Sequence, residues 1–175
     1  SMTVSAWCTA ASITTGWQCL IAKGEGNGWR MHRRGSDVPE QFAWTGGVGD
    51  TPAHSTEITV GGEPETWHHV VGVTESVSGI ETLYIDGVEV ATKSGAVLED
   101  RGNRMRIGEN PDALGRGWNG KVDDVAIWAR ALSADEISEI WAAGEGASIE
   151  VLLGGGTQFA ITDISYDNKG TDDRS

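Results

Sequence analysis

The stretch of residues 107–141 constrains the fold more than any other part of this chain. It reads in order as a strand end (Ile-Gly-Glu-Asn), a glycine-rich loop, an alternating strand with the adjacent carboxylates Asp123 and Asp124, and a short amphipathic helix. Successive side chains of a strand point to opposite faces, so this strand would bury one face and expose the other. We expect the helix to pack on the edge of the same sheet.

The helix carries signals for both of its ends. Ser133 can cap the first turn and Glu136 can bond back to the cap, which is the capping-box pattern. Gly144 is expected to end the helix, because glycine readily takes the left-handed conformation found at helix C-termini. The apolar face would be formed by Ile137, Ile140 and Trp141.

Most of the remaining chain consists of short alternating runs separated by turns. Asp86-Gly87 lies between two apolar runs and predicts a tight hairpin, since both residues tolerate positive φ. The 25 glycines favour many turns over long helices. Frequent turns between short strands indicate a β-sandwich. The expected strands cover residues 4–8, 17–22, 29–33, 41–44, 57–60, 67–73, 83–85, 88–90, 105–108 and 122–128.

Three segments of the sequence follow one another in an order that indicates a known type of domain. Residues 67–71 (Trp-His-His-Val-Val), the hairpin of residues 83–90 and residues 107–141 together resemble the laminin-G-like, concanavalin A-like jelly-roll domains of bacterial secreted and surface proteins. The resemblance extends from Val4 to Ala143. It implies an all-β, concanavalin A-like jelly-roll β-sandwich with one short C-terminal helix. The same fold carries lectins, adhesion modules and glycosidases, so function must be argued from the site.

The composition changes after Gly144. We expect residues 1–146 to form the jelly-roll domain, and residues 147–175 to be a linker with three consecutive glycines that leads into a further β module. In related bacterial surface proteins such a segment opens another domain, so the resemblance implies a larger multidomain chain. The alternative is that residues 159–167, which alternate like a strand, add an edge strand to the sandwich.

The net charge of −13 argues against some classes of partner. A phosphate backbone requires a basic patch, so nucleic acid is not an expected partner, and the same charge disfavours an anionic membrane surface. The sequence has no run of about 18 apolar residues, so we expect no membrane insertion. The resemblance implies an extracellular, cell-surface or periplasmic location, with a glycan or another protein as the partner.

The sequence does not predict catalysis, and we assign no catalytic residue. Retaining glycosidases need two carboxyl groups about 5 Å apart, and glucanases of the resembling fold carry them at alternate positions of one strand. That run is absent from this sequence, and Asp123 and Asp124 are neighbours that point to opposite faces. His68 and His69 face opposite ways for the same reason, so they are not a ligand pair on one face.

The resemblance also implies calcium as a cofactor. In similar folds the Asp in the strand after the Gly-Trp-Asn-Gly loop gives a side-chain oxygen to the ion, and Asp123 occupies that position. Asp124 is the next candidate, and Gly24 and Glu25 begin a loop that could supply carbonyl oxygens. Calcium would then brace loops. The alternative is that Asp123 bonds backbone amides in a turn or bulge.

Tryptophan points to carbohydrate. The chain has eight Trp but only two Tyr and two Phe, and sugars stack their C–H faces on indole rings. We expect four of the rings in the core, namely Trp7, Trp67, Trp128 and Trp141. For Trp17, Trp29, Trp44 and Trp118 the choice between core and an exposed platform stays open. The predicted ligand-binding residues are Trp29, Arg30, His32, Trp44, Trp118 and Asn119.

Two local questions have alternative answers. Arg30, His32 and Arg34 share one strand face, which could meet an acidic glycan or pair with the domain's own carboxylates, and we favour the pairing. Cys8 and Cys19 could form a cross-strand disulfide or stay buried thiols.

The leading functional hypothesis is a noncatalytic, carbohydrate-binding recognition module. The alternative is a protein-protein adhesion or spacer module, and a glycoside hydrolase is least favoured.

Overall fold

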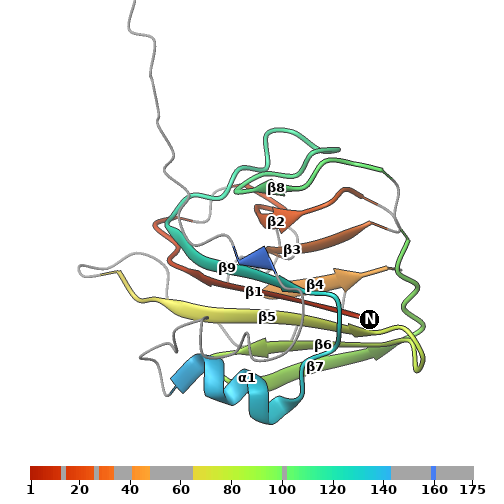
Figure 1. Ribbon diagram of the computed structural model, residues 1–175. Coiled ribbons are helices and arrows are strands. Elements are labelled where there is room, and N and C mark those ends of the chain that lie inside the picture. Colours follow the sequence, from red (N-terminus) through yellow and green to blue (C-terminus); the bar gives the residue numbers. More distant parts are fainter. Residues whose placement is uncertain are drawn as a thin grey trace, which may run out of the picture.

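The structure is a computed structural model that describes residues 1–12, 15–25, 28–33, 41–47, 65–99, 102–142 and 159–160. Its strands form two antiparallel sheets (Figure 1). One sheet contains β1 (Met2–Cys8), β5 (His68–Glu75), β6 (Ile80–Ile85), β7 (Val88–Ser94), β9 (Val122–Trp128) and β10 (Phe159–Ala160). The other contains β2 (Cys19–Ala22), β3 (Trp29–Arg33), β4 (Phe42–Gly46) and β8 (Arg106–Ile107).

The order of the strands is β10-β9-β1-β5-β6-β7 in the six-stranded sheet and β4-β3-β2-β8 in the four-stranded sheet. Strands distant in sequence therefore become neighbours, as β1 does between β9 and β5. This arrangement confirms the predicted all-β jelly-roll sandwich. No helix within the described ranges is long and apolar enough to cross a membrane.

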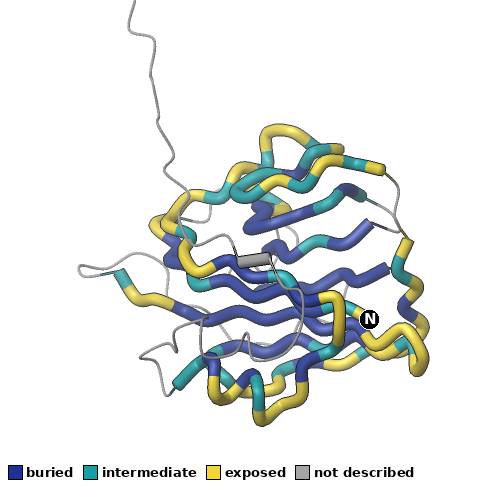
Figure 2. The backbone as a smooth tube through the Cα atoms, viewed as in Figure 1, coloured by how far each residue is buried: buried dark blue, intermediate teal, exposed yellow. Residues whose placement is uncertain are grey.

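The main core lies between the two sheets and appears as continuous buried segments in Figure 2. Alternation along β1 directs Val4, Ala6 and Cys8 inward. On the opposite sheet, Trp29 and Trp44 face them from β3 and β4, with ring centroids 6.1 Å apart. The core therefore uses two of the eight tryptophans directly between the sheets.

A second apolar layer covers part of the outer face of the six-stranded sheet. The helix α1 (Ala134–Trp141) packs Ile137 and Ile140 against that face, where Val73 and Trp128 lie. Its capping box is formed as predicted. The backbone N–H of Glu136 donates to Ser133 Oγ (3.3 Å), and Ser133 N–H donates to the Glu136 carboxylate (2.8 Å).

Some predicted boundaries were wrong. The helix ends at Ala142, which takes the left-handed conformation (φ 46°), and so stops before Gly144. The second strand begins at Cys19, because Trp17 lies in a turn with φ 62°. The predicted hairpin is confirmed, with Asp86 and Gly87 both at positive φ. Residues 57–60 lie outside the described residues.

β10 bears on the C-terminal segment. Phe159 pairs with Ile127 and Ala160 with Ala126, so these two residues extend the six-stranded sheet beyond β9. The pairing favours the added edge strand at this point of the chain. The boundary at residue 146 stays a prediction, because most of residues 147–175 lie outside the described part of the chain.

Candidate functional site

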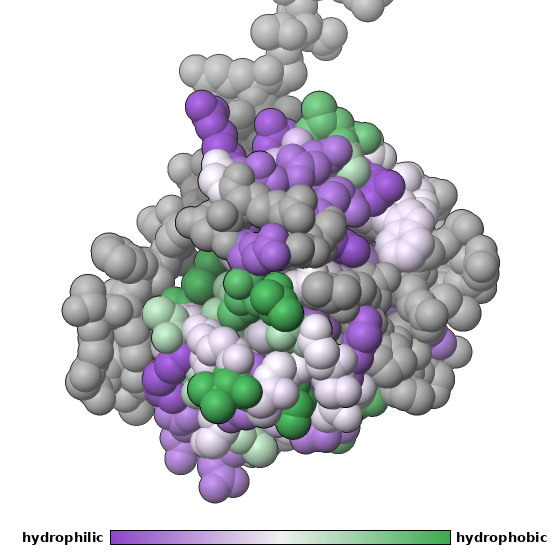
Figure 3. All heavy atoms as spheres, turned by 90° about the vertical axis from the view of Figure 1, so that its right-hand side faces the viewer, coloured by the Kyte–Doolittle hydropathy of each residue, from purple (hydrophilic) through white to green (hydrophobic). Residues whose placement is uncertain are grey.

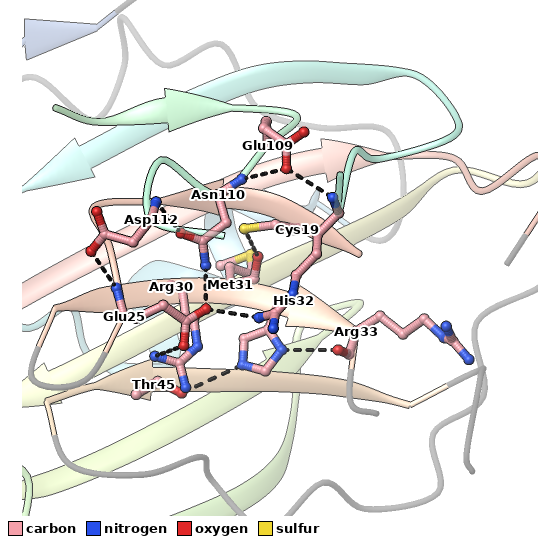
Figure 4. Close-up of polar contacts among 11 residues, drawn as sticks. Cys19, Glu25, Arg30, Met31, His32, Arg33, Thr45, Glu109, Asn110 and Asp112 are labelled. Atoms are coloured by element: carbon pink, nitrogen blue, oxygen red, sulfur yellow. Dashed lines mark hydrogen bonds and ion pairs between the residues drawn. The ribbon is translucent and has the colours of Figure 1, made fainter. Parts of the chain in front are cut away.

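Polar side chains gather on the outer face of the four-stranded sheet. Trp29 and Met31 of β3 point into the core, so Arg30 and His32 point outward, as the alternation predicts. The strand register places Thr45 of β4 beside Arg30. Figure 4 shows these side chains together with those of the loop after β8. This outer face is the candidate site.

His32 is fixed on this face by bonds at both ring nitrogens. Nδ1 donates to the carbonyl oxygen of Arg33 (2.9 Å), and Nε2 lies 3.5 Å from Thr45 Oγ1 (Figure 4). The His32 side chain is buried, so it supports the site from beneath the exposed surface and is not accessible to solvent.

Glu25 links the sheet to the loop after β8. Its carboxylate accepts hydrogen bonds from Arg116 Nη1 (2.8 Å) and Asn110 Nδ2 (2.6 Å), and it lies 3.9 Å from Arg30 Nη1. The Glu25 backbone N–H donates to Asp112 Oδ2 (3.1 Å). Because Glu25 and Arg116 remain partly solvated, each ion pair contributes modestly to stability, and the main effect is to hold the loop in place.

The loop itself is organised around one carboxylate. Glu109 accepts from the backbone N–H groups of Asn110 (2.9 Å), Gly115 (3.3 Å) and Arg116 (3.1 Å). The two ends of the loop bond to β2, through Gly108 N–H to Leu20 O and Cys19 N–H to Arg116 O, each at 2.8 Å. The glycine-rich loop of the sequence motif is therefore a rigid border of the site.

Trp17 provides the exposed aromatic surface of the site. Its side chain is 37% exposed, and its ring lies 5.6 Å from that of His32. A bulky residue at φ 62° is uncommon and strained by about 1–2 kcal/mol. The turn is held by Arg33 N–H, which donates to Gln18 O (2.8 Å), and by Gln18 Nε2, which donates to Gly117 O (3.1 Å).

Two predicted platform residues are in the wrong place for that role. Trp44 is fully buried and donates from Nε1 to Thr74 Oγ1 (2.9 Å), and Trp29 packs beside it in the core. Rings buried between two sheets cannot stack on a sugar, so the prediction of Trp29 and Trp44 as ligand-binding residues is wrong. The other alternative for both rings, a place in the core, is correct.

Trp118 and Asn119 follow Gly117, which bridges to Cys19 at the end of the loop after β8. Trp118 is partly buried, packs 5.5 Å from the Phe42 ring and donates from Nε1 to Thr9 O (2.9 Å). Asn119 is exposed and donates from Nδ2 to Ser12 Oγ. Contact of Arg30, Trp118 or Asn119 with a ligand stays a prediction, whereas the buried His32 can act only by supporting Trp17. Arg30 lies near Glu25, which supports the pairing alternative for the basic face.

The proposed calcium ligands do not come together. Asp123 and Asp124 lie on β9 of the six-stranded sheet, whereas Gly24 and Glu25 follow β2 of the other sheet. Glu25 is already engaged by Arg116 and Asn110, and Asp123 Oδ1 accepts from the backbone N–H of Asp124 (2.9 Å) at a β-bulge. Within the described ranges no group of three or more His, Cys, Asp or Glu side chains is arranged to hold a metal ion. These four residues therefore do not fit one shared calcium ion.

The cysteines are free thiols on different sheets. Burial raises the pKa of Cys8 far above its usual range and that of Cys19 to about 12, although Arg30 acts in the opposite direction on Cys19. Both sulfurs are therefore protonated at neutral pH and are poor nucleophiles. Of the two alternatives for these residues, the buried thiol is the correct one.

Three of the four tryptophans predicted in the core are at least partly exposed. Trp67 is 39% exposed, so its predicted place in the core is wrong, whereas Trp128 is buried as expected. Trp7 and Trp141 are only partly buried. Trp17 was left open between core and platform, and Gly16 before it gave a usable signal, since a turn next to glycine releases a side chain from strand alternation.

The family model described as "Concanavalin A-like lectin/glucanases superfamily", of laminin-G type, matches residues 1–138. A search of curated proteins finds no match.

Several solved structures share the fold at low sequence identity. A Bacteroides ovatus protein named as a candidate carbohydrate-binding protein has 14% identity and a TM-score of 0.64, over 78% of this chain and 39% of that one. Domain 4 of AbnA, an extracellular arabinanase of Geobacillus stearothermophilus solved with arabinotriose, has 19% identity and a TM-score of 0.59, over 78% and 64%. The CBM40 of a Ruminococcus gnavus sialidase has 12% identity and a TM-score of 0.55, over 78% and 80%. This chain spans about two fifths of the first protein and just under two thirds of the second.

Proposed function

Because this chain belongs to the concanavalin A-like lectin/glucanases superfamily, we propose that it is a noncatalytic carbohydrate-recognition module of a larger extracellular, cell-surface or periplasmic protein. The observation that carries the proposal is Trp17, a strained and exposed indole held against His32 on the outer face of the four-stranded sheet. Backbone strain concentrates at functional sites, where surrounding contacts hold a residue in an unfavourable conformation.

The platform would act by stacking and by hydrogen bonding. A sugar places its C–H face on the exposed side of Trp17, while polar groups around the ring fix its orientation. The ion-paired side chains of Arg116 and Glu25, 34% and 37% exposed, provide guanidinium and carboxylate groups for that purpose. The solved neighbours support a saccharide ligand, since two of them are a domain in complex with arabinotriose and a CBM40.

A noncatalytic role agrees with the chemistry of the site. The Glu25 carboxylate is held by Arg116 and Asn110, and both buried thiols are protonated at neutral pH. Glycosidic cleavage requires one carboxyl group to act as an acid and a second to act as a nucleophile or base. We therefore propose recognition without turnover, with any catalysis located elsewhere in a larger protein.

A glycan array tests this function directly. The domain should bind one or more saccharides, and Trp17→Gly should abolish that binding without loss of fold. Trp17→Phe keeps a smaller aromatic face and should retain part of the affinity. Val88→Ala shortens an apolar side chain of the other sheet that is more exposed than Trp17 (61% against 37%), and it is the control. Binding that survives Trp17→Gly unchanged would remove Trp17 from the site.

Calcium remains a prediction under this proposal, in the role of bracing loops. The array is therefore run with calcium and again with a chelator, and the midpoint of thermal unfolding is measured in both. If calcium raises the midpoint of thermal unfolding of the wild type but not that of Asp123→Asn, the ion is assigned to β9. Identical binding and stability in the two conditions would remove calcium from the proposal.

A protein partner is the second candidate function. The end of the molecule shown in Figure 3 has apolar spots among polar residues, and Val77, Ile80 and Val97 are exposed large apolar side chains. The turn and the segment after β7 that carry them are bonded through Ala96 N–H to Gly79 O (2.9 Å). Exposed apolar patches often mark protein contacts. Under this alternative a folded domain binds no saccharide, and Val77→Ser weakens association with a partner chain.

A further inference from the structure

The outer face of the six-stranded sheet has two different halves. The helix α1 covers the half that contains Val73 and Trp128. The other half carries the partly exposed Trp7 on β1. Its register partners are His69 on β5 and Asp123 on β9, three strands that lie side by side in Figure 1. An indole ring therefore lies between an imidazole and a solvent-exposed carboxylate.

The ring of Trp7 is held in a fixed orientation. It stacks on the His69 ring with a centroid distance of 5.1 Å and an interplanar angle of 27°. His69 is buried, and its Nε2 lies 2.8 Å from Ser5 Oγ. Burial lowers the pKa of His69 to about 4, against a smaller opposing effect of Asp86, so the supporting ring is neutral at pH 7. A rigid backing reduces the entropy lost when a ligand stacks on the indole.

Trp67 adds a second aromatic surface beside Trp7. It directly precedes β5 and lies two residues before His69, so the alternation of β5, continued by one residue, would place Trp67 on the outer face. Glu65 accepts a hydrogen bond from Thr9 Oγ1 (3.0 Å), which shows that the chain still runs along the continuation of β1 at this point. Diagonal neighbours on adjacent strands are about 7–8 Å apart, within reach of aromatic side chains. On this alternation, the exposed indole of Trp67 and the partly exposed indole of Trp7 share one face of the sheet.

The charge around these rings selects the class of ligand. Glu65 is paired with Lys121 (3.0 Å). No cation of the described chain pairs with Asp123 or Asp124, and Asp123 uses only Oδ1 to accept from the Asp124 N–H. The surface therefore carries unbalanced negative charge and would repel uronic, sialylated or sulfated sugars. Asp123 Oδ2 is left to accept a hydrogen bond from a hydroxyl group.

We propose that Trp7, Trp67 and Asp123 form a second binding surface, for uncharged saccharides, on the outer face of the six-stranded sheet. The two indoles stack on neighbouring sugar rings, and the Asp123 carboxylate accepts a hydroxyl hydrogen. Trp17 lies on the outer face of the other sheet, so the two surfaces face in opposite directions. A module with both can link two saccharide chains. The second surface does not depend on Trp17.

The test uses isothermal titration of the whole chain with cellohexaose, xylohexaose and arabinohexaose as uncharged probes, and with sialyllactose as an anionic one. Titrations are made in the wild type and in Trp17→Gly, which removes the first platform. In that background we expect at least one uncharged hexasaccharide to bind and the anionic sugar to fail. Trp67→Ala and Asp123→Asn should each weaken the remaining binding about tenfold, and the control Val88→Ala should not.

Each outcome decides the matter. If the wild type binds and Trp17→Gly binds none of the uncharged probes, the second surface is refuted while the first platform stands. If binding persists in Trp17→Gly but is unchanged by Trp67→Ala and Asp123→Asn, the saccharide lies elsewhere and the proposal is equally refuted. If Trp7→Ala, made as a third variant, unfolds because the ring packs on His69, Trp67→Ala and Asp123→Asn still give the answer. Failure of every probe on the wild type refutes both sites for these sugars.

Discussion

Gly72 on β5 gives the most decisive test of how the two sheets are packed. A Cβ atom added there would lie 2.2 Å from Trp44 Cδ2 and 2.4 Å from Cε3, whereas carbon atoms in contact prefer about 3.5–4.0 Å. The overlap cannot relax easily. β5 is hydrogen-bonded to β1 and β6 on its two sides, and the Trp44 indole is fixed by Thr74. Overpacking of this kind costs about 1–3 kcal/mol or more, so we expect Gly72→Ala to cost about 3 kcal/mol.

The assay is urea unfolding followed by far-ultraviolet circular dichroism, because tryptophan fluorescence would itself change near Trp44. For a domain of this size the loss corresponds to a fall in melting temperature of about 6–12 °C. Gly108→Ala is the control for backbone strain without overlap, since Gly108, unlike Gly72, has positive φ (77°) and no atom lies within 4 Å of an added Cβ; it should cost about 1–2 kcal/mol. In Trp44→Leu, Gly72→Ala should become milder by at least about 1 kcal/mol. Equal costs for Gly72→Ala and Gly108→Ala would refute the packing argument.

Three further predictions concern Trp17, His69 and Ser133. Trp17→Gly relieves backbone strain of about 1–2 kcal/mol and loses a ring contact of about 0.5–1.5 kcal/mol, so its unfolding free energy should stay within about 1 kcal/mol of the wild type. Trp17→Ala keeps the strain and should be less stable than Trp17→Gly in urea unfolding. The reverse order of stability would contradict the argument that Trp17 is strained. Burial lowers the pKa of His69 to about 4, so the unfolded chain binds a proton before the folded protein does as the pH falls from about 6.5 to 4. Over that window the unfolding free energy of the wild type should fall by about 3 kcal/mol more than that of His69→Gln. Parallel pH profiles of unfolding free energy for the two proteins would show that His69 does not titrate this way. Ser133→Ala removes the helix cap and should cost about 1 kcal/mol, measured as a lower urea midpoint with unchanged slope.

Features fixed by a few neighbouring residues were predictable from the sequence. The capping box of Ser133 and Glu136 and the Asp86-Gly87 hairpin depend on hydrogen bonds and backbone angles within one turn. Alternation along β3 correctly separated Trp29 from Arg30, because a strand paired on both sides has only two faces. Errors at helix and strand ends arose where a residue without glycine's freedom adopted positive φ, as at Ala142 and Trp17.

Features that depend on pairing between distant segments were not predictable in this way. The four residues grouped as calcium ligands are close to loops in the sequence, but the topology divides them between two sheets. The same division separates Cys8 from Cys19, although their strands are consecutive. Only the sheet order decides such questions, and sheet order is set by contacts between residues about 60 to 120 positions apart, such as those of β1 with β5 and β9.

The tryptophans show why residue type alone cannot locate a binding platform. Trp44 is buried because Gly72, on the facing sheet, leaves room for an indole that any Cβ would displace. Trp17 is exposed because it lies in the turn before β2, and Trp67 because it precedes the first residue of β5. Whether an indole contributes to the core or to recognition is therefore decided by what faces it across the sheet. The two outer faces that retain exposed indoles, one beside His32 and one beside His69, are where ligand binding should be sought.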